Sequence, residues 1–372
     1  MSIVASLIGA LVVTIWLVLL FGRARWWRAA ERDEERLPEP PAWPDVVAVV
    51  PARDEAAVVG RAVASLVAQD YPGTFRVIVV DDGSADATAA IAAGAGATVV
   101  RAAPLADGWT GKLAAVAQGI AAAGEPHFVW LTDADIAHAP DTLRRLVARA
   151  LAEDRVLVSH MALLRTDSAA ERALVPAFVW FFMLLFPFAR VARPGPIAAA
   201  AGGVMLVDRA ALARVGGIAA IRGALIDDCA LARLMKTQGA IRLTLTRRSV
   251  SLRPYPRFAD VGAMIARSAY AQLGYSPLLL AGTLAGLAVT FVAPPLLAVL
   301  AGGAPRFAGI AAWAMMSAAF QPILRYYRRS PAWGAAVPLI AVFYGWYTLV
   351  SAVQFGRGRG GQWKGRSQAA LT

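Results

Sequence analysis

Three groups of aspartates in this sequence stand where apolar stretches end or where a helical pattern begins. They are Asp81-Asp82, Asp133-Ala134-Asp135 and Asp227-Asp228. Carboxylate oxygens are the ligands that Mg²⁺ and Mn²⁺ prefer, and such a cation can also bind the oxygens of a diphosphate. If the fold gathers these side chains, they suit a metal-assisted reaction of a phosphorylated ligand.

Apolar runs alternate with helical patterns, and these elements would gather the aspartates. The runs predict strands at 46–50, 76–80, 98–100, 128–131 and 156–158. Helical patterns cover 56–69 and begin near Ala85, Lys112 and Pro140. The alternation predicts an α/β fold with a doubly wound, Rossmann-like sheet, which binds ligands at the carboxyl ends of its strands. Asp82, Asp133 and Asp135 fall at those ends.

Asp133 and Asp135 form the chemically sharpest motif. Two carboxylates one residue apart at a strand end can approach one hard divalent cation, with diphosphate and water completing its coordination. Because Asp-x-Asp is common in turns, the alternative is a solvated turn that caps the helix beginning near Pro140. The other acidic groups favour the metal site, with Mg²⁺ or Mn²⁺ as its cation.

The hydrophobic content of the chain, 58% of 372 residues, is high for a wholly soluble protein. Residues 3–22 form an almost unbroken apolar stretch, close to the roughly 20 residues that cross a bilayer. Arg23, Arg25 and Arg28 follow this stretch instead of preceding it, which favours a retained membrane anchor over a cleaved signal peptide. These charges also predict that the chain enters the cytoplasm after the anchor.

Four further apolar stretches predict more membrane contacts. They cover 174–192, 278–300, 307–323 and 335–355. The first contains Pro176, Pro187 and Arg190, so we expect an interfacial helix there and treat the last three as candidate spans. The predicted division is an anchor at 1–22, a charged and proline-rich linker at 23–45, a sheet domain at 46–274 with the interfacial helix at 174–192, a membrane region at 275–356 and a basic tail at 357–372.

The topology of the last three stretches stays open. Arg325, Arg328 and Arg329 lie in one loop, and a second basic group lies in the tail, with a single candidate span between the two groups. Both groups cannot face the cytoplasm if that span crosses the membrane. Pro294-Pro295 interrupts another of the stretches, so one candidate can be re-entrant or interfacial, and the sequence does not say which.

The net charge of +12 raises the question of a nucleic-acid partner. Many of the basic residues flank apolar stretches, where anionic lipid headgroups are the ordinary partners, so we expect a membrane and no nucleic acid. The single cysteine, Cys229, excludes an intrachain disulfide, and three histidines without metal-ligand spacing argue against a zinc site.

Several motifs together resemble the family 2 glycosyltransferases, which have the GT-A fold. In the family's order they are Val49-Val-Pro-Ala-Arg-Asp-Glu55, Val79-Val-Asp-Asp-Gly-Ser-Ala-Asp-Ala-Thr88, Gly111-Lys112, Thr132-Asp-Ala-Asp135, Gly202-Gly203 and Ile226-Asp-Asp-Cys-Ala-Leu-Ala-Arg233. The resemblance covers roughly 46–274. It implies a nucleotide-diphospho-sugar transferase domain that uses a nucleotide sugar, expected to be a UDP-sugar, together with Mg²⁺ or Mn²⁺.

A closer resemblance, across nearly the whole chain, is to the hopene-associated glycosyltransferases called HpnB. It rests on Pro41-Ala-Trp-Pro44, Trp109-Thr-Gly-Lys112, the stretches 132–140 and 217–233, and Ser251-Leu-Arg-Pro-Tyr-Pro256. It implies a multi-pass enzyme of the bacterial inner membrane whose catalytic domain faces the cytoplasm. The implied acceptor is a lipid of hopanoid or polyprenyl type.

The resemblance also assigns roles in binding the donor. Asp82 would face the uracil or an equivalent base, with Arg53 and Glu55 near the nucleoside. Asp133 and Asp135 would lie at the ribose and at the metal-bound diphosphate. The alternative for Asp82 is a capping turn with Ser84.

Two basic residues are expected near the phosphates. Lys112 begins a helix, so its charge and the helix N-terminus can both face phosphate; the alternative is a solvated lysine in the first turn. Arg267 keeps the arginine of the Gln-x-x-Arg-Trp motif of many membrane-bound relatives and can contact the diphosphate. Met264 and Ser268 stand in place of the glutamine and the tryptophan, which favours a single transfer over polymer synthesis.

Asp228 matches the catalytic base of the family, and Asp227 stands where a glutamate is more usual. In an inverting transfer one carboxylate deprotonates the acceptor hydroxyl as it attacks the anomeric carbon. Alternatively, one of the two aspartates caps the helix that follows. Gly202 and Gly203, together with Asp227, mark the region where the family builds its acceptor site.

Two other functions share parts of this pattern. A nucleotidyltransferase that makes a sugar nucleotide would have a similar sheet, but it would also have a glycine-rich phosphate loop, which 51–55 is not. A catalytically inactive membrane scaffold would not need the acidic residues, all of which are present.

Overall fold

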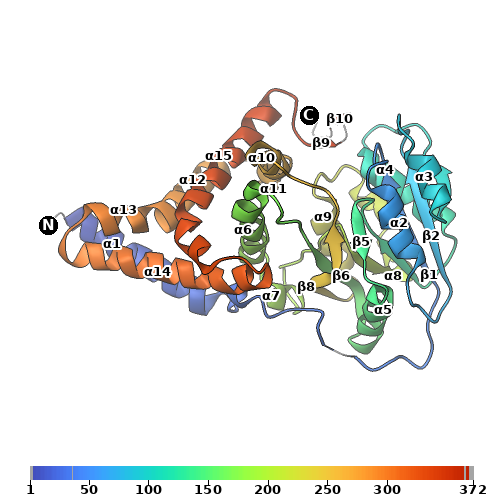
Figure 1. Ribbon diagram of the computed structural model, residues 1–372, viewed down its shortest axis with the longest axis horizontal. Coiled ribbons are helices and arrows are strands. Elements are labelled where there is room, and N and C mark those ends of the chain that lie inside the picture. The colour runs from blue at the N-terminus through green and yellow to red at the C-terminus, as the bar shows by residue number, and fades with distance from the viewer. Residues whose placement is uncertain (1–2, 36, 364–365, 368–372) are drawn as a thin grey trace.

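The computed structural model describes residues 3–35, 37–363 and 366–367. A sheet domain forms one end of the molecule and long helices form the other, with the N-terminus at the tip farthest from the sheet (Figure 1). Most of the predicted basic tail from residue 364 onward, including Lys364, lies outside the described residues.

The main sheet of the described chain is mixed. Its strands are β1 (Val46–Ala52), β2 (Phe75–Asp81), β3 (Thr98–Arg101), β4 (Phe128–Leu131), β5 (Ile136–His138), β6 (Arg155–Leu163), β7 (Met205–Asp208) and β8 (Ala240–Ser251), in the order β3-β2-β1-β4-β7-β6-β8-β5. The strands β3, β2, β1 and β4 are parallel, whereas β7 runs antiparallel to both of its neighbours.

The predicted α/β fold is confirmed, and the sheet contains three strands, β5, β7 and β8, that the sequence did not predict. The run 156–158 lies in the first half of the longer strand β6, and β7 separates β6 from β4. The sequence did not predict β7, because four residues after a pair of glycines carry too little pattern to identify a strand. The continuous parallel part of the sheet therefore consists of β3, β2, β1 and β4, and a second parallel pair, β6 and β8, lies beyond β7.

Helices cover both faces of this sheet, which is why β1 and β2 are apolar at nearly every position. One face packs under α4 (Gly111–Ala122) and α9 (Asp227–Met235). The other packs under α2 (Val59–Val67) and α5 (Thr142–Ala152), while α3 (Thr88–Gly94) flanks β3 and α8 (Arg209–Arg214) follows β7. Burial on both faces fixes the strand ends that carry the aspartates.

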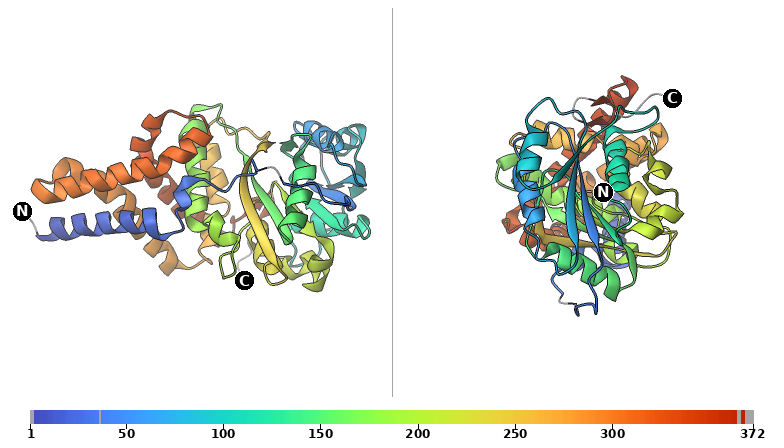
Figure 2. Two further views of the ribbon diagram at one scale, coloured as in Figure 1. Left: turned by 90° about the horizontal axis from the view of Figure 1, so that it is seen from below. Right: turned by 90° about the vertical axis from the view of Figure 1, so that its right-hand side faces the viewer.

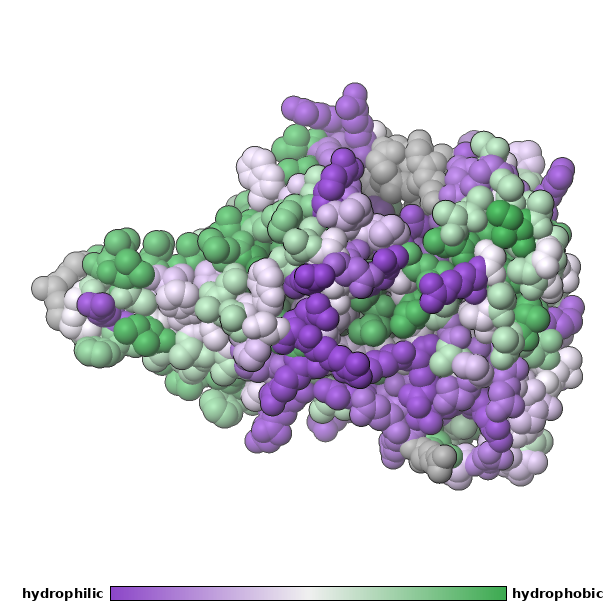
Figure 3. All heavy atoms as spheres, in the orientation of Figure 1, coloured by the Kyte–Doolittle hydropathy of each residue, from purple (hydrophilic) through white to green (hydrophobic). Residues whose placement is uncertain are grey.

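Within the described residues, five helices are long and apolar enough to cross a membrane. They are 3–22 (α1, Ile3–Leu17, with a π-helical turn), 169–191 (α6, Ala169–Leu185, and α7, Phe188–Val191), 277–300 (α12, Pro277–Leu287, and α13, Ala293–Leu300, joined by the π-helical η4, Ala288–Val292), 303–326 (α14, Gly303–Tyr326) and 331–356 (η5, Pro331–Ala336, and α15, Val337–Gly356). Between the second and third lie α10 (Phe258–Ala266) and α11 (Ala269–Gln272). Apolar residues cover the helical end of the surface, and hydrophilic ones gather where it meets the sheet domain (Figure 3).

The segment predicted to be interfacial forms α6. This helix runs across the direction of α1 and α14, between them and the sheet domain (Figures 1 and 2). Its Trp180 is fully buried among Trp16, Phe291 and Phe320, which come from three of the other long helices. The helix thus joins the two ends of the molecule.

Candidate active site

Lys112 lies at the centre of a cluster of carboxylates. Its Nζ is 2.9 Å from Oδ1 of Asp133 and 3.0 Å from Oδ2 of Asp227. Burial alone would lower the pKa of Lys112, but Asp133, Asp227 and Asp228 outweigh it and raise that pKa. Lys112 therefore stays charged, and it is an ion-paired residue of the site instead of a solvated lysine.

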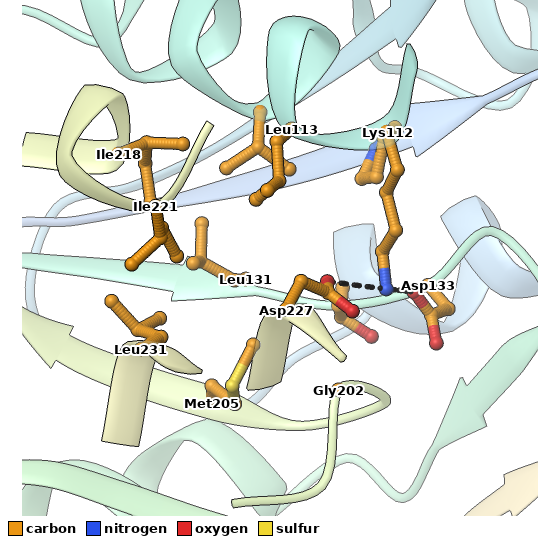
Figure 4. Close-up of a pocket in the computed structure, with 13 residues that line it drawn as sticks. Lys112, Leu113, Leu131, Asp133, Gly202, Met205, Ile218, Ile221, Asp227 and Leu231 are labelled. Carbon is orange, nitrogen blue, oxygen red and sulfur yellow. Dashed lines mark ion pairs between the residues drawn. The ribbon is translucent and has the colours of Figure 1, made fainter. Parts of the chain in front are cut away.

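Three elements bring these side chains together. Lys112 is in the first turn of α4, whose N-terminus is capped by the Thr110 hydroxyl, Asp133 follows β4, and Asp227 begins α9. Figure 4 shows Lys112 reaching from α4 toward both aspartates, with apolar side chains lining the other side of the pocket. These include Leu113, Leu131, Met205, Ile218, Ile221 and Leu231. The apolar wall limits the water around the ion pairs and so strengthens them.

Asp228 is held beside this cluster by a backbone contact. Its Oδ2 accepts a hydrogen bond of 3.0 Å from the backbone N–H of Gly202. A Cβ at Gly202 would lie 3.3 Å from Nζ of Lys112 and 3.5 Å from Oδ2 of Asp228, so a larger residue there would crowd both groups. Burial and the neighbouring Asp227 raise the pKa of Asp228 to about 6, against the opposing effects of Lys112 and two backbone N–H groups.

Arg253 forms a second charged group that the sequence analysis did not identify. Its Nε is 2.6 Å from Oδ2 of Asp135, and its Nη2 is 2.5 Å from Oε1 of Glu55. It follows β8 and lies in the Leu-Arg-Pro-Tyr-Pro motif, which was visible in the sequence only as part of a resemblance. Arg253 thus links Asp135, a predicted metal ligand, to Glu55, a predicted contact of the nucleoside.

Arg53 and Asp82 lie together next to that group. Nη1 of Arg53 donates to the backbone oxygen of Asp82 at 2.6 Å and is 3.4 Å from its Oδ2. The N–H of Ser84 donates to Oδ1 of Asp81, so the aspartate that caps this turn is Asp81. The carboxylate of Asp82, which is buried, is not needed for that cap.

The remaining predicted residues frame the site. Arg267 directly follows α10 and is exposed. Burial opposes the charge of Asp133, but Lys112 and, to a smaller extent, Arg267 outweigh it and lower the pKa of Asp133. The backbone oxygen of Gly203 accepts a hydrogen bond of 2.7 Å from the Thr132 hydroxyl, which also contacts His138 at 3.0 Å. Gly203 therefore anchors the Asp133 turn.

The donor chemistry of Asp133 and Asp135 fits a hard divalent cation. No group of three or more His, Cys, Asp or Glu side chains that could hold a metal occurs among the described residues. Each carboxylate is instead paired with a cationic side chain, Asp133 with Lys112 and Asp135 with Arg253. A metal at this turn would thus need further ligands from a bound molecule, and it would compete with Lys112 and Arg253.

Comparison with known proteins relates part of this site to a family domain. Residues 47–216 match the family described as "Glycosyl transferase family 2". The match includes Lys112 and the Asp133 turn and ends before Asp227.

Two curated relatives match parts of the chain. The 4,4'-diaponeurosporenoate glycosyltransferase of Staphylococcus aureus (strain MRSA252) is 40% identical over 89 residues, which cover 24% of this chain and 23% of the relative. The succinoglycan biosynthesis protein ExoO of Rhizobium meliloti (strain 1021) is 37% identical over 130 residues, which cover 35% and 36%. The matched segments thus span about a third or less of these relatives.

One solved structure resembles nearly the whole chain. The mannosyltransferase PcManGT from Pyrobaculum calidifontis, solved in complex with GDP-Man and Mn²⁺, has a TM-score of 0.55 and 21% sequence identity. The alignment covers 93% of this chain and 98% of that one. At this identity the likeness establishes the shared fold.

Proposed function

We propose that this chain, whose residues 47–216 form a glycosyl transferase family 2 domain, is a membrane-bound inverting glycosyltransferase. It moves one sugar from a nucleotide sugar, with UDP-sugars as the first candidates, to a hydroxyl group of a lipid. The resemblance to HpnB suggests an acceptor of hopanoid or polyprenyl type. The name of one relative, a 4,4'-diaponeurosporenoate glycosyltransferase, agrees with an apolar acceptor.

One observation carries the proposal: the Asp228 carboxylate, held by the backbone N–H of Gly202, lies beside a charged lysine and the Asp133 turn. The pKa of Asp228 is about 6, so this carboxylate is deprotonated at neutral pH and is still basic enough to accept a proton. The hydrogen bond from Gly202 orients it.

The reaction then follows from these positions. Asp228 takes the proton of the acceptor hydroxyl as its oxygen attacks the anomeric carbon. The bond from that carbon to the diphosphate oxygen breaks, and the nucleoside diphosphate leaves with the bonding electrons. No glycosyl-enzyme intermediate is needed.

The other residues bind the donor. Arg53, Asp82 and Glu55 would contact the nucleoside, while Lys112 and Arg267 would contact the phosphates. Asp133 and Asp135 would hold Mg²⁺ or Mn²⁺, which would neutralise charge on the leaving diphosphate. With the arginines 23, 25 and 28 after the first apolar helix, the domain would face the cytoplasm, where nucleotide sugars are made.

Calorimetry separates this function from its rivals. The purified protein should bind UDP in the presence of Mn²⁺ and much more weakly in its absence. A membrane scaffold would bind UDP in neither case, and a nucleotidyltransferase would prefer a nucleoside triphosphate to UDP.

We expect the pH dependence of the transfer rate to follow the ionisation of Asp228. Because the base works only when deprotonated, kcat/KM should fall as the pH drops through about 6 and level off above it. Initial rates measured across about pH 5 to 8 check this. A flat profile over that range would exclude Asp228 as the base whose ionisation limits the rate.

Arg253 should compete with the metal for Asp135. Replacement by glutamine removes the guanidinium charge, so Mn²⁺ should bind the UDP complex of the protein about fivefold more tightly, since a partly exposed ion pair is worth up to about 1 kcal/mol. Arg253→Lys keeps the charge and is the matched control. Calorimetry that gives equal or weaker Mn²⁺ binding to Arg253→Gln would contradict the competition.

A further inference from the structure

We propose that the segment 331–356 enters and leaves the membrane on the same side, so that the chain crosses the bilayer three times. The three spans are 3–22, 277–300 and 303–326. Length and hydropathy make 331–356 look like a further span, but its contacts at both ends argue against a crossing.

The beginning of the segment folds back along the preceding span. Nε2 of Gln321 donates to the backbone oxygen of Pro331 at 3.1 Å. Farther from the end of α14, the hydroxyl of Ser317 donates to the oxygen of Gly334 at 3.0 Å, and Nε1 of Trp313 donates to that of Ala335 at 3.1 Å. From Pro331 to Ala336, η5 therefore runs back along α14, from the C-terminal end of α14 toward the middle of that helix.

The rest of the segment returns to the sheet-domain side. The hydroxyl of Tyr344 donates to the backbone oxygen of Leu174 in α6 at 2.9 Å. The hydroxyl of Ser351 donates to the oxygen of Ala266 at 2.5 Å and accepts from the N–H of Tyr270 at 3.1 Å. The helices α10 and α11 directly follow the sheet domain in the chain. Because the last turns of α15 contact these helices, α15 ends on the side of the membrane where the sheet domain lies.

The direction of α15 agrees with these contacts. In Figure 1, α1 and α14 lie lengthwise toward the N-terminal tip, whereas α15 runs at a steep angle to them and ends near α10. The chain turns from α13 into α14 at the tip, far from the sheet domain. A helix that began at the end of α14 and crossed the membrane would have to end at that tip.

One face of α15 is apolar and uncovered. Its exposed residues recur every three or four positions, which is one side of a helix. They are Leu339, Val342, Trp346, Leu349 and Val353, with exposed fractions from 37% to 76%. The neighbouring helices α13 and α14 also expose large apolar residues, and the occupant of the α15 face is the acyl-chain region of one leaflet.

The three-span arrangement also explains how the basic groups on both sides of this segment can face the cytoplasm. Arg325, Arg328 and Arg329 precede the segment, and Arg357 and Arg359 follow it. A re-entrant segment leaves both groups on the side of the sheet domain, together with the arginines that follow the first span, as the positive-inside bias requires. A fourth span would separate the two groups.

The meaning of this arrangement for catalysis rests on the proposed function, although the topology does not. Tyr347 of α15 packs so closely on α10 that a Cβ at Gly262 would overlap its ring. Because Arg267 directly follows α10, a lipid-facing helix supports the donor site. A lipid acceptor would then approach from the same leaflet.

Single cysteines in a Cys229→Ser background test the topology. We would place them at Gly302, Ser330 and Arg357, all exposed, and treat right-side-out and inside-out membrane vesicles with a membrane-impermeant maleimide. Ser330→Cys and Arg357→Cys should react from the same face, and Gly302→Cys from the opposite face. Reaction of Ser330→Cys and Arg357→Cys from opposite faces would establish a fourth span and overturn the proposal.

Further variants keep the test decisive. Arg325→Cys replaces Ser330→Cys if the latter does not fold, and thermal unfolding matched to the Cys229→Ser parent selects the variants that are scored. Val342→Cys should resist the maleimide in both kinds of vesicle and react once the membrane is dissolved in detergent. Fast reaction of Val342→Cys in vesicles would contradict lipid cover. The reactivity of Glu34→Cys shows on which side of the membrane the sheet domain lies. This variant therefore distinguishes a reversed orientation, which would contradict the proposed supply of donor from the cytoplasm, from a fourth span.

Discussion

Replacement of Asp228 by asparagine should reduce turnover by about 10²-fold or more, because general-base assistance is typically worth about 10² to 10⁴. Asparagine keeps the shape of the side chain and can still accept the hydrogen bond of the Gly202 N–H. Donor affinity should therefore stay nearly unchanged. Steady-state rates together with calorimetry of UDP binding separate the two effects.

Asp227→Asn is the matched control for this prediction. Asp227 neighbours Asp228 but is paired with Lys112, so its loss should affect phosphate binding more than proton transfer. Wild-type turnover in Asp228→Asn would move the role of the base elsewhere, with Asp227 the first residue to test.

Replacement of Asp135 by asparagine should abolish detectable transfer while the protein still folds. The loss of one anionic ligand removes a direct contact to the cation, and stabilisation of leaving-group charge by a metal is worth several kcal/mol, which is about 10²-fold or more in rate. Mn²⁺-dependent UDP binding should weaken as well. Calorimetry and a transfer assay on the same preparation measure both.

Asp70→Asn provides the control for Asp135. Asp70 pairs with Arg144 in an exposed ion pair outside the site, so its replacement should change neither UDP binding nor transfer. Unchanged Mn²⁺-dependent UDP binding in Asp135→Asn would remove this residue from the metal site.

Local sequence patterns were sufficient to predict the strands that carry the acidic residues. A run such as 76–80 is apolar at nearly every position because both faces of β2 are buried, and the turn after it begins with aspartates. Since parallel strands end at one edge of a sheet, strand prediction alone placed Asp82 and Asp133 near one another. Gly202 was marked only by resemblance, and its hydrogen bond to Asp228 required the structure.

Contacts between distant parts of the chain could not be predicted in this way. Arg253 is 198 positions from Glu55 and 118 from Asp135, and no local pattern links an arginine after one strand to carboxylates after two others. The pairing of Lys112 with Asp227 is hidden for the same reason. The sequence suggested that Lys112 faces phosphate, and its carboxylate partners became visible only in the structure.

Hydropathy likewise indicates whether a helix can lie in lipid, but it does not show whether that helix crosses the membrane or returns to the same side. The segments 303–326 and 331–356 are similar in length and apolar character. They differ in what they contact, since only the second folds back along its neighbour through side-chain hydrogen bonds from Trp313, Ser317 and Gln321. Those bonds are contributed by another helix and are invisible in the segment itself.

The most direct test of the central claim is transfer itself. The purified enzyme, in vesicles made from a total bacterial lipid extract, is incubated with a panel of radiolabelled nucleotide sugars, and the labelled lipid is analysed by mass spectrometry. We predict that one nucleotide sugar labels a lipid by the mass of one sugar residue, only with Mg²⁺ or Mn²⁺, and about 10²-fold more slowly or not at all with Asp228→Asn. Labelling that persists without a divalent cation and at the wild-type rate in Asp228→Asn, or no labelled lipid with any donor, would contradict it.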